Sequence, residues 1–220
     1  MAEIKACIFD MDGVLVSTEI YHFKAWKRLT ETVLGFSIDE KFNENLKGVS
    51  RAVCVDLILQ HAGLHKSPEE KAELAAQKNK WFLEYVQTEI TPANVYPGVI
   101  DFLKSLKQKE IKTAIGSASK NAPLLVEKLG IKPYFNAIVD GNMITKAKPN
   151  PEVFLKGAEL IGVPPENCVV FEDAKSGVEA AKNAGMHCIG VGSPEILTDA
   201  DFCISSFTEM SLERLKSVLV

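Results

Sequence analysis

Ile8-Phe9-Asp10-Met11-Asp12-Gly13-Val14 is the most informative stretch of the sequence. The mostly apolar residues 4–9 predict a buried strand. Asp10 and Asp12 follow at a spacing of two, and side chains two residues apart in an extended chain point the same way. Gly13 then permits a sharp turn. We therefore expect both carboxylates to face one site past the carboxyl end of a strand, where open parallel α/β sheets bind their ligands.

The two neighbouring carboxylates predict a bound cation. They repel each other unless one is protonated or a cation lies between them. Mg²⁺ would relieve the repulsion, because it prefers oxygen ligands. The alternative is a strand end with two solvated acids, since aspartate is common in turns. The apolar strand before the acids and the glycine after them favour the metal site.

Composition and charge exclude several classes of function. The 220 residues are 46% hydrophobic and 25% charged, which is ordinary for a soluble protein of one large or two modest domains. The net charge of −4 predicts neither nucleic acid nor an anionic membrane as partner. No secretory signal or membrane-spanning run is recognised. The five cysteines are odd in number and are not spaced as metal or redox pairs. We expect a cytoplasmic monomer with a small-molecule substrate.

The pattern along the chain divides it into two parts. Residues 18–90 have an almost entirely helical pattern, with a strong helix start at Ser67-Pro68-Glu69-Glu70. After the linker that begins at Thr91, strands and helices alternate, which indicates a parallel sheet with helices on both faces. We therefore predict an α/β fold with a doubly wound parallel sheet. Its core domain comprises residues 1–16 and 92–220, and a helical cap domain, residues 17–91, is inserted after the first strand.

Candidate catalytic residues follow four of the predicted strands. They are Asp10 and Asp12; Ser117 with Ala118, Ser119, Lys120 and Asn121; Lys148, before Pro149; and Glu172 with Asp173. A hydroxyl with free backbone N–H groups at a helix start is a natural phosphate seat. Each signal alone is weak, since a serine after a strand is usually a cap and a lone lysine is usually solvated. Together, carboxylates for a hard cation, a hydroxyl and an ammonium suit phosphoryl transfer.

This order of residues resembles the haloacid dehalogenase superfamily of phosphotransferases over the whole chain, which implies a Rossmann-type core. Within the superfamily, the helical segment resembles the β-phosphoglucomutase family. The strings that carry this second resemblance are Tyr21-His22-Phe23-Lys24-Ala25-Trp26, Phe42-Asn43-Glu44-Asn45-Leu46-Lys47-Gly48-Val49-Ser50-Arg51, Lys78-Asn79 and Ser117-Ala118-Ser119-Lys120-Asn121. The strand-end motifs specify only the superfamily, whereas these strings are more specific.

The resemblance implies a role for each candidate in the core. Asp10 would be the nucleophile that becomes an aspartyl phosphate, and Asp12 the general acid and base for the sugar hydroxyls. Ser117 and Lys148 would hold the transferring phosphoryl group. The implied Mg²⁺ ligands are Asp10, the backbone carbonyl of Asp12, Glu172 and Asp173.

The resemblance also implies roles in the helical segment. Arg51 would clamp the second, non-transferring phosphate, a task that suits a planar bidentate guanidinium. Gly48 and Val49 would shape the sugar contact, while His22 and Lys78 would link cap closure to Asp12. The remaining predicted substrate-binding residues are Trp26, Lys47, Ala118, Ser119, Lys120 and Asn121, although Trp26 also suits simple packing on an apolar helix face.

The resemblance implies interconversion of β-glucose 1-phosphate and glucose 6-phosphate through a bisphosphate intermediate. A sugar-phosphate phosphatase of the same fold is the main alternative. A phosphonatase, with Lys47 as Schiff base, and a non-catalytic sugar-phosphate sensor are less favoured. Several positions depart from the family pattern, because Ser17 is usually aspartate, Cys54 serine and Ala174 often serine, while Met11 conservatively replaces a common leucine. Cys54 lies one helical turn from Arg51, so this departure bears on sugar specificity.

Overall fold

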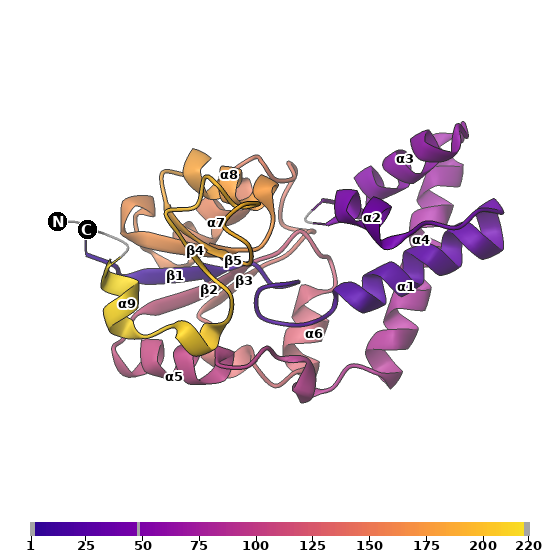
Figure 1. Cartoon of the computed structure of the whole chain (residues 1–220). Helices are drawn as coiled ribbons and strands as arrows, with labels where there is room; N and C mark the ends of the chain where they lie inside the picture. Colours follow the sequence, from indigo (N-terminus) through magenta and orange to yellow (C-terminus); the bar gives the residue numbers. More distant parts are fainter. Residues whose placement is uncertain (1–2, 48, 218–220) are drawn as a thin grey trace. The chain divides into compact units, whose positions relative to one another are not determined.

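The computed structural model describes residues 3–47 and 49–217, and its chain divides into two compact units (Figure 1). The first unit comprises Met1–Ser17 and Thr91–Val220, and the second comprises Thr18–Ile90. Among the described residues, no helix is both long and apolar enough to cross a membrane. Gly48, a predicted sugar contact, lies outside the described residues.

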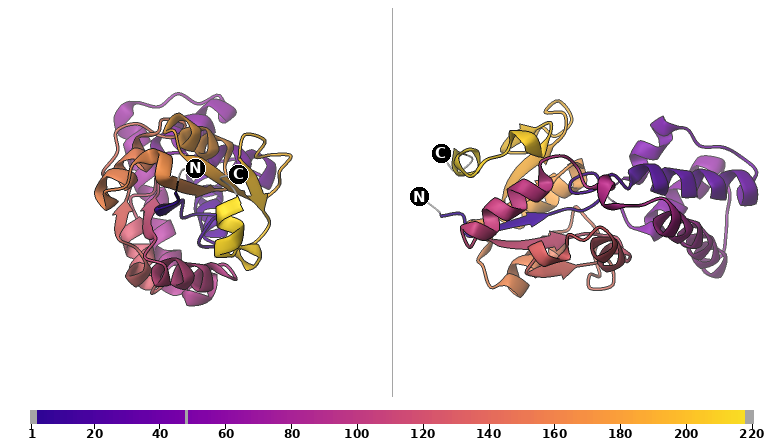
Figure 2. Two further views of the ribbon diagram at one scale, coloured as in Figure 1. Left: turned by 90° about the vertical axis from the view of Figure 1, so that its left-hand side faces the viewer. Right: turned by 90° about the horizontal axis from the view of Figure 1, so that it is seen from below.

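The first unit is built on a parallel sheet with strand order β3-β2-β1-β4-β5-β6 (Figures 1 and 2). Its described strands are β1 (Ala6–Phe9), β2 (Lys112–Gly116), β3 (Ala137–Val139), β4 (Cys168–Glu172), β5 (His187–Val191) and β6 (Phe202–Ile204). Phe9 in β1 is level with Ile115 in β2 and Phe171 in β4. The residues that follow these three strands therefore emerge side by side, and the predicted doubly wound parallel sheet is confirmed.

Helices cover both faces of this sheet. The helices of the first unit are α5 (Val99–Gln108), α6 (Ala122–Lys128), α7 (Glu152–Ile161), α8 (Lys175–Asn183) and α9 (Leu212–Ser217). Adjacent residues of a strand point to opposite faces. Ile8 accordingly joins an aliphatic core with residues of α7 and α8, whereas the Phe9 ring packs against Phe102 of α5 at 6.4 Å and stacks on Phe171 at 4.8 Å. Figure 1 displays α5 on one side of the sheet and α7 and α8 on the other.

The second unit is helical and has its own apolar core. Its helices are α1 (Glu19–Leu29), α2 (Glu40–Asn43), α3 (Arg51–Ala62) and α4 (Pro68–Thr88). The predicted start of α4 is confirmed, because the Ser67 hydroxyl accepts from the Glu70 amide at 3.3 Å and the Glu70 carboxylate accepts from the Ser67 amide at 2.8 Å. Trp26, Leu29 and Ile58 are among the buried residues of this core.

One predicted helix is α-helical over only part of its length. The sequence pattern predicts a single helix over residues 21–34, but after Leu29 the chain forms a π-helical segment, Thr30–Leu34. The hydroxyls of Thr30 and Thr32 donate to the carbonyls of Lys27 and Arg28, at 3.0 and 2.6 Å. Such bonds compete with the regular helical pattern, which gives a physical reason for the difference.

Candidate active site

Three of the predicted residues meet at the carboxyl ends of β1 and β4. The Lys148 ammonium donates short hydrogen bonds to both Asp10 Oδ1 and Glu172 Oε1. Asp10 directly follows β1, where its amide donates to the Phe171 carbonyl at 2.9 Å. All three side chains are buried, with exposed fractions of 7% for Asp10, 4% for Lys148 and 1% for Glu172. In the sequence, Lys148 alone is a weak signal. In the structure it bonds both carboxylates of this cluster.

Burial and neighbouring charges have opposite effects on the pKa of Lys148. Burial by itself lowers the pKa of Lys148, but the carboxylates of Asp10 and Glu172 outweigh it and hold that pKa above its ordinary value. Burial raises the pKa of the Glu172 carboxyl and Asp10 adds to this effect, while Lys148 and the backbone amide of Ala174 act against it. Lys148 therefore supplies a fixed positive charge beside the candidate nucleophile.

The loop after β2 presents a buried hydroxyl. Ser117 is 1% exposed, and its amide donates to the Val139 carbonyl at 3.0 Å. Its hydroxyl accepts from the Ser119 amide at 3.1 Å, and the Ser119 hydroxyl accepts from the Asn121 amide at 3.2 Å. The predicted phosphate seat is therefore a tightly bonded loop. Two of the backbone N–H groups expected to be free there are already bonded within it.

A second close approach fixes the middle of this loop. The Gly141 amide donates to the Ser119 carbonyl at 3.3 Å. A Cβ atom at Gly141 would lie 2.3 Å from the Ala118 carbonyl oxygen and 3.1 Å from Cγ of Lys120. Only glycine fits such an approach without moving the backbone. Ala118 and Ser119 are partly exposed and Lys120 is exposed.

The other predicted metal ligands lie on the same strand ends. Asp12 lies in the turn after β1, where Gly13 has a φ of 90° and its amide donates to the Val16 carbonyl at 3.0 Å. Asp173 directly follows Glu172, and both aspartates are partly exposed. Within residues 3–47 and 49–217, no group of three or more His, Cys, Asp or Glu side chains forms a ready-made metal cage.

The oxygen donors nevertheless suit Mg²⁺. Asp10 and Glu172 bind the same ammonium, so two buried carboxylates already converge on one positive charge. Mg²⁺ is usually held by only one or two carboxylates, together with waters and substrate phosphates, rather than by an all-protein cage. The donor set therefore fits this ion.

Arg51 is the first residue of α3 in the second unit. The preceding Ser50 caps this helix, because its hydroxyl accepts from the Val53 amide at 3.4 Å. The Arg51 side chain is partly buried, and burial lowers the pKa of its guanidinium. Within the described part of the chain, no carboxylate forms an ion pair with Arg51. A partly desolvated guanidinium at a helix N-terminus is suited to bind an anion.

His22 and Lys78 form a buried pair in the second unit. Lys78 is 2% exposed, and its ammonium lies 2.8 Å from His22 Nδ1 and 4.7 Å from the centre of the Trp26 ring. An ammonium can only donate, so Nδ1 accepts and the imidazole is neutral. Burial, followed by the charges of Lys78 and Arg51, holds the pKa of His22 well below its ordinary value. Trp26, which faces the Lys78 ammonium, is 2% exposed.

Lys47 lies between two glutamates. Its ammonium is 3.0 Å from Glu44 and 3.4 Å from Glu19. Burial lowers the pKa of Lys47, but the two glutamates more than offset it and raise the pKa overall. A Schiff-base lysine must lose its proton to attack a carbonyl, so this environment argues against the phosphonatase alternative. Val49, two residues further along, packs against the core of the second unit.

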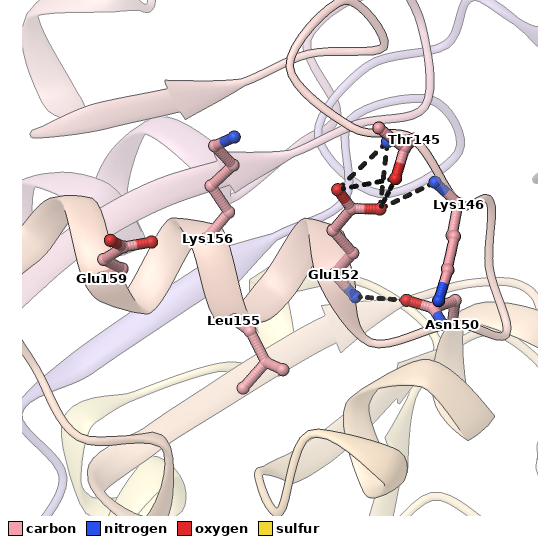
Figure 3. Close-up of a pocket in the computed structure, with 7 residues that line it drawn as sticks. All are labelled: Thr145, Lys146, Asn150, Glu152, Leu155, Lys156 and Glu159. Atoms are coloured by element: carbon pink, nitrogen blue, oxygen red, sulfur yellow. Dashed lines mark hydrogen bonds between the residues drawn. The ribbon is translucent and has the colours of Figure 1, made fainter.

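A pocket of about 450 Å³ lies along α7 (Figure 3). Its lining residues are Thr145, Lys146, Asn150, Glu152, Leu155, Lys156 and Glu159, and none of the candidate catalytic residues is among them. Sequence reasoning missed Glu152, whose carboxylate accepts from the amides of Thr145, at 3.0 Å, and Lys146, at 2.7 Å. These bonds tie the loop that carries Lys148 to the first turn of α7. A glutamate at a helix start after proline is the only sequence signal for this role.

The parallel sheet and its strand-end residues are those of haloacid dehalogenase-like hydrolases. The model of that family matches residues 4–185, and the chain belongs to it. The resemblance to β-phosphoglucomutases is confirmed as well. The chain is 38% identical to beta-phosphoglucomutase of Bacillus subtilis, over 96% of this chain and 94% of that protein. A crystal structure of beta-phosphoglucomutase from Clostridium difficile matches with a TM-score of 0.93 and 38% identity, over 98% of this chain and 96% of that one.

Phosphatases are also among the relatives. The chain is 34% identical to the phosphorylated carbohydrates phosphatase of Thermotoga maritima, over 84% of each protein. Membership of the family therefore establishes an enzyme of the haloacid dehalogenase-like type, and the choice between mutase and phosphatase depends on the site.

Proposed function

We propose that this protein is a Mg²⁺-dependent β-phosphoglucomutase. It would interconvert β-D-glucose 1-phosphate and D-glucose 6-phosphate through an aspartyl-phosphate enzyme and a β-glucose 1,6-bisphosphate intermediate. The similarity to two β-phosphoglucomutases extends over both units of the chain, which supports the proposal. The five described cysteines are all free, in keeping with a reducing, cytoplasmic compartment, where we expect the enzyme to act as a monomer.

The chemistry we assign to the first unit is transfer of a phosphoryl group to and from Asp10. A carboxylate oxygen of Asp10 would attack phosphorus as the bond to the sugar oxygen breaks, and Asp12 would protonate that oxygen. Lys148 and Ser117 would bind the phosphoryl oxygens, with Lys148 supplying its buried positive charge. Asp10, the carbonyl of Asp12, Glu172 and Asp173 would hold Mg²⁺, which neutralises phosphoryl charge. In the reverse step the sugar's other hydroxyl loses its proton to Asp12 and takes the phosphoryl group.

The observation that supports the mutase is the partly buried guanidinium of Arg51 at the start of α3. A mutase has to bind an intermediate with a phosphate at each end, whereas a phosphatase needs one phosphate site. Arg51 is partly buried at the start of α3 and lies near the His22–Lys78 pair. Its positive charge, together with that of Lys78, lowers the pKa of His22. We assign the non-transferring phosphate to this guanidinium.

The remaining candidates are assigned around the two phosphates. Val49 and Gly48 would contact the sugar, and Lys78, supported by Trp26, would act with His22 in coupling the second unit to catalysis. Lys47 would reach the substrate only by leaving Glu19 and Glu44. The residues of the loop after β2 that we assign to substrate binding are Ala118, Ser119, Lys120 and Asn121.

The alternative function is hydrolysis of a small hexose phosphate, with water discharging the aspartyl phosphate. The similarity to a carbohydrate phosphatase favours it. It would use the same cluster in the first unit but would give Arg51 no essential task.

Replacing Arg51 separates the two functions. We predict that Arg51→Ala lowers isomerisation of β-glucose 1-phosphate by about 100-fold, the equivalent of about 3 kcal/mol for a lost charged phosphate contact. Formation and slow hydrolysis of the aspartyl phosphate from acetyl phosphate should be nearly unchanged. Both rates are measured on the same preparation.

Arg28→Ala is the matched control. This arginine lies in the same unit, but its guanidinium is paired with Glu84 at 3.2 Å and lies over the Trp81 ring at 4.6 Å. The control should isomerise like the unaltered protein. Unchanged isomerisation in Arg51→Ala would remove Arg51 from the phosphate-binding role.

A further inference from the structure

Gly177 lies where the first turns of α8 pack on the candidate active site. A Cβ atom at this position would be 1.8 Å from Oε1 and 1.9 Å from Cδ of Glu172. Both distances are far shorter than any non-bonded contact between these atoms. The carboxylate of Glu172 therefore occupies the space that any other residue at position 177 would fill.

The carboxylate cannot simply move aside. One oxygen, Oε1, binds the Lys148 ammonium, and the other, Oε2, accepts from the Ala174 amide at 2.8 Å. The Glu172 side chain is 1% exposed, so a displaced carboxylate would lose these partners without gaining water. Displacement would leave buried charged groups unpaired, which is strongly unfavourable.

A comparison with Gly157 indicates that this contact is special. Gly157 lies inside α7, and a Cβ atom there would meet the side chains of Ile8 at 3.5 Å and Ala114 at 3.8 Å, which are ordinary packing distances. Glycine is a poor helix former, and one inside a helix usually has a packing or functional reason. At Gly177 the reason is a polar atom of the site rather than an apolar neighbour.

We propose that Gly177 is a positioning residue for Glu172. The missing side chain leaves room for a glutamate, which is longer than an aspartate, to lie against α8. One of its oxygens is directed to Lys148 and the other to the amide of Ala174, the N-cap residue of α8. Positions 172 and 177 are then matched in size, and a larger residue at 177 would require the shorter aspartate at 172. The consequence for catalysis rests on the proposed function, in which Glu172 binds Mg²⁺, whereas the packing claim does not.

The packing claim is tested by thermal unfolding without metal. Gly177→Ala should lower Tm by roughly 5–10 °C in the unaltered protein, as expected for overpacking in a chain of this size. In the Glu172→Ala background the same substitution should leave Tm unchanged or raise it, because the obstructing carboxylate is gone and alanine favours the helix. Gly157→Ala is the matched control and should cause no such loss in either background.

The positioning claim is tested by Mg²⁺ affinity and by turnover. Mg²⁺ titrated calorimetrically into Gly177→Ala should bind roughly 10- to 100-fold more weakly, the usual effect of disturbing a ligand's support. The kcat for phosphoryl transfer should fall more than KM rises. Adding Glu172→Asp to Gly177→Ala should recover at least about 10-fold of the affinity that Gly177→Ala lost.

Each outcome decides the proposal. If Gly177→Ala does not fold but Glu172→Ala combined with Gly177→Ala does, the packing claim is supported. If Glu172→Ala alone folds but its combination with Gly177→Ala does not, the cause is not Glu172 and the proposal fails. Unaltered Mg²⁺ affinity in a folded Gly177→Ala variant would also overturn the proposal. So would a double variant, Glu172→Asp with Gly177→Ala, whose loss of Mg²⁺ affinity is the sum of the losses in the two single variants. A protein that hydrolyses rather than isomerises sugar phosphates would refute the proposed function and leave the unfolding results intact.

Discussion

Lys148 joins two carboxylates that would otherwise repel each other in a buried site. Placing these charges out of water is costly, and removal of one partner from a buried ion pair typically destabilises a protein by about 3–5 kcal/mol. The burial of Asp10, Lys148 and Glu172 therefore makes the cluster sensitive to any change of charge. A catalyst benefits from this arrangement, because charges fixed before the reaction need no reorganisation during it.

Lys148→Ala should lower phosphoryl transfer by several orders of magnitude, because the phosphoryl oxygens lose their fixed counter-charge. It should also lower Tm in the absence of metal, since Asp10 and Glu172 then face each other without a cation. Mg²⁺ should raise the Tm of this variant more than that of the unaltered protein. Rate and Tm are measured with Lys146→Ala as control, because that nearby lysine lines the pocket along α7 and is not one of the buried residues. Similar results for both variants would contradict the central place of Lys148.

Asp10→Asn should lower turnover by more than roughly 1,000-fold, because an amide is a poor nucleophile and a poor Mg²⁺ ligand. The fold should persist, with a lower Tm, because Glu172 still pairs with the Lys148 ammonium. Circular dichroism and the rate of isomerisation are compared with those of Asp140→Asn. Asp140 is another buried aspartate that directly follows a strand, and its replacement should keep most of the turnover. Substantial isomerisation by Asp10→Asn would exclude it as the nucleophile.

At the scale of elements, the loop between β3 and α7 decides where the Lys148 ammonium lies. This loop is tied to α7 by side chains, because Glu152 accepts from the amides of Thr145 and Lys146 and the Lys156 ammonium donates to the Met143 carbonyl at 2.8 Å. The backbone amides of Lys146 and Thr145 lower the pKa of the Glu152 carboxyl, so the carboxylate is ionised at neutral pH. A partly exposed side chain thus ties down the loop that carries the buried Lys148.

Glu152→Ala should lower kcat by roughly 10-fold through a small displacement of Lys148, with little change in KM. Glu152→Gln, which keeps one accepting oxygen, should lie between the alanine variant and the unaltered protein. Glu159→Ala, on the same helix and beside the same pocket, serves as the control and should be fully active. Equal kcat values for Glu152→Ala and Glu159→Ala would mean that the loop holds its shape without Glu152.

The elements also explain which parts of the site the sequence could predict. Asp10, Ser117 and Glu172 lie at the carboxyl ends of apolar runs that read as strands, so the rule that ligands bind at strand ends points to them. The contact of Gly177 with Glu172 escapes such reasoning, because sequence displays only a glycine in a helix. The burial of Lys148 escapes it too, since that depends on how a loop of irregular backbone folds back onto the sheet.

At the scale of the whole molecule, each unit has its own apolar core and its own group of candidate site residues. The first unit contains the buried cluster of Asp10, Lys148 and Glu172. The second contains Arg51 beside the His22–Lys78 pair. Such a division suits a reaction that handles two phosphates, because each phosphate can then be recognised by a different part of the chain. A phosphatase of the same family would need only the first unit's site.

The most direct test follows both products of one substrate. The purified protein is mixed with β-glucose 1-phosphate, Mg²⁺ and a catalytic amount of glucose 1,6-bisphosphate, and phosphorus NMR records glucose 6-phosphate and inorganic phosphate together. The proposed function predicts that nearly all substrate consumed appears as glucose 6-phosphate, with inorganic phosphate as a minor product, and that the α anomer is not converted. Inorganic phosphate equal to the substrate consumed, with no glucose 6-phosphate, would contradict the mutase and establish the phosphatase.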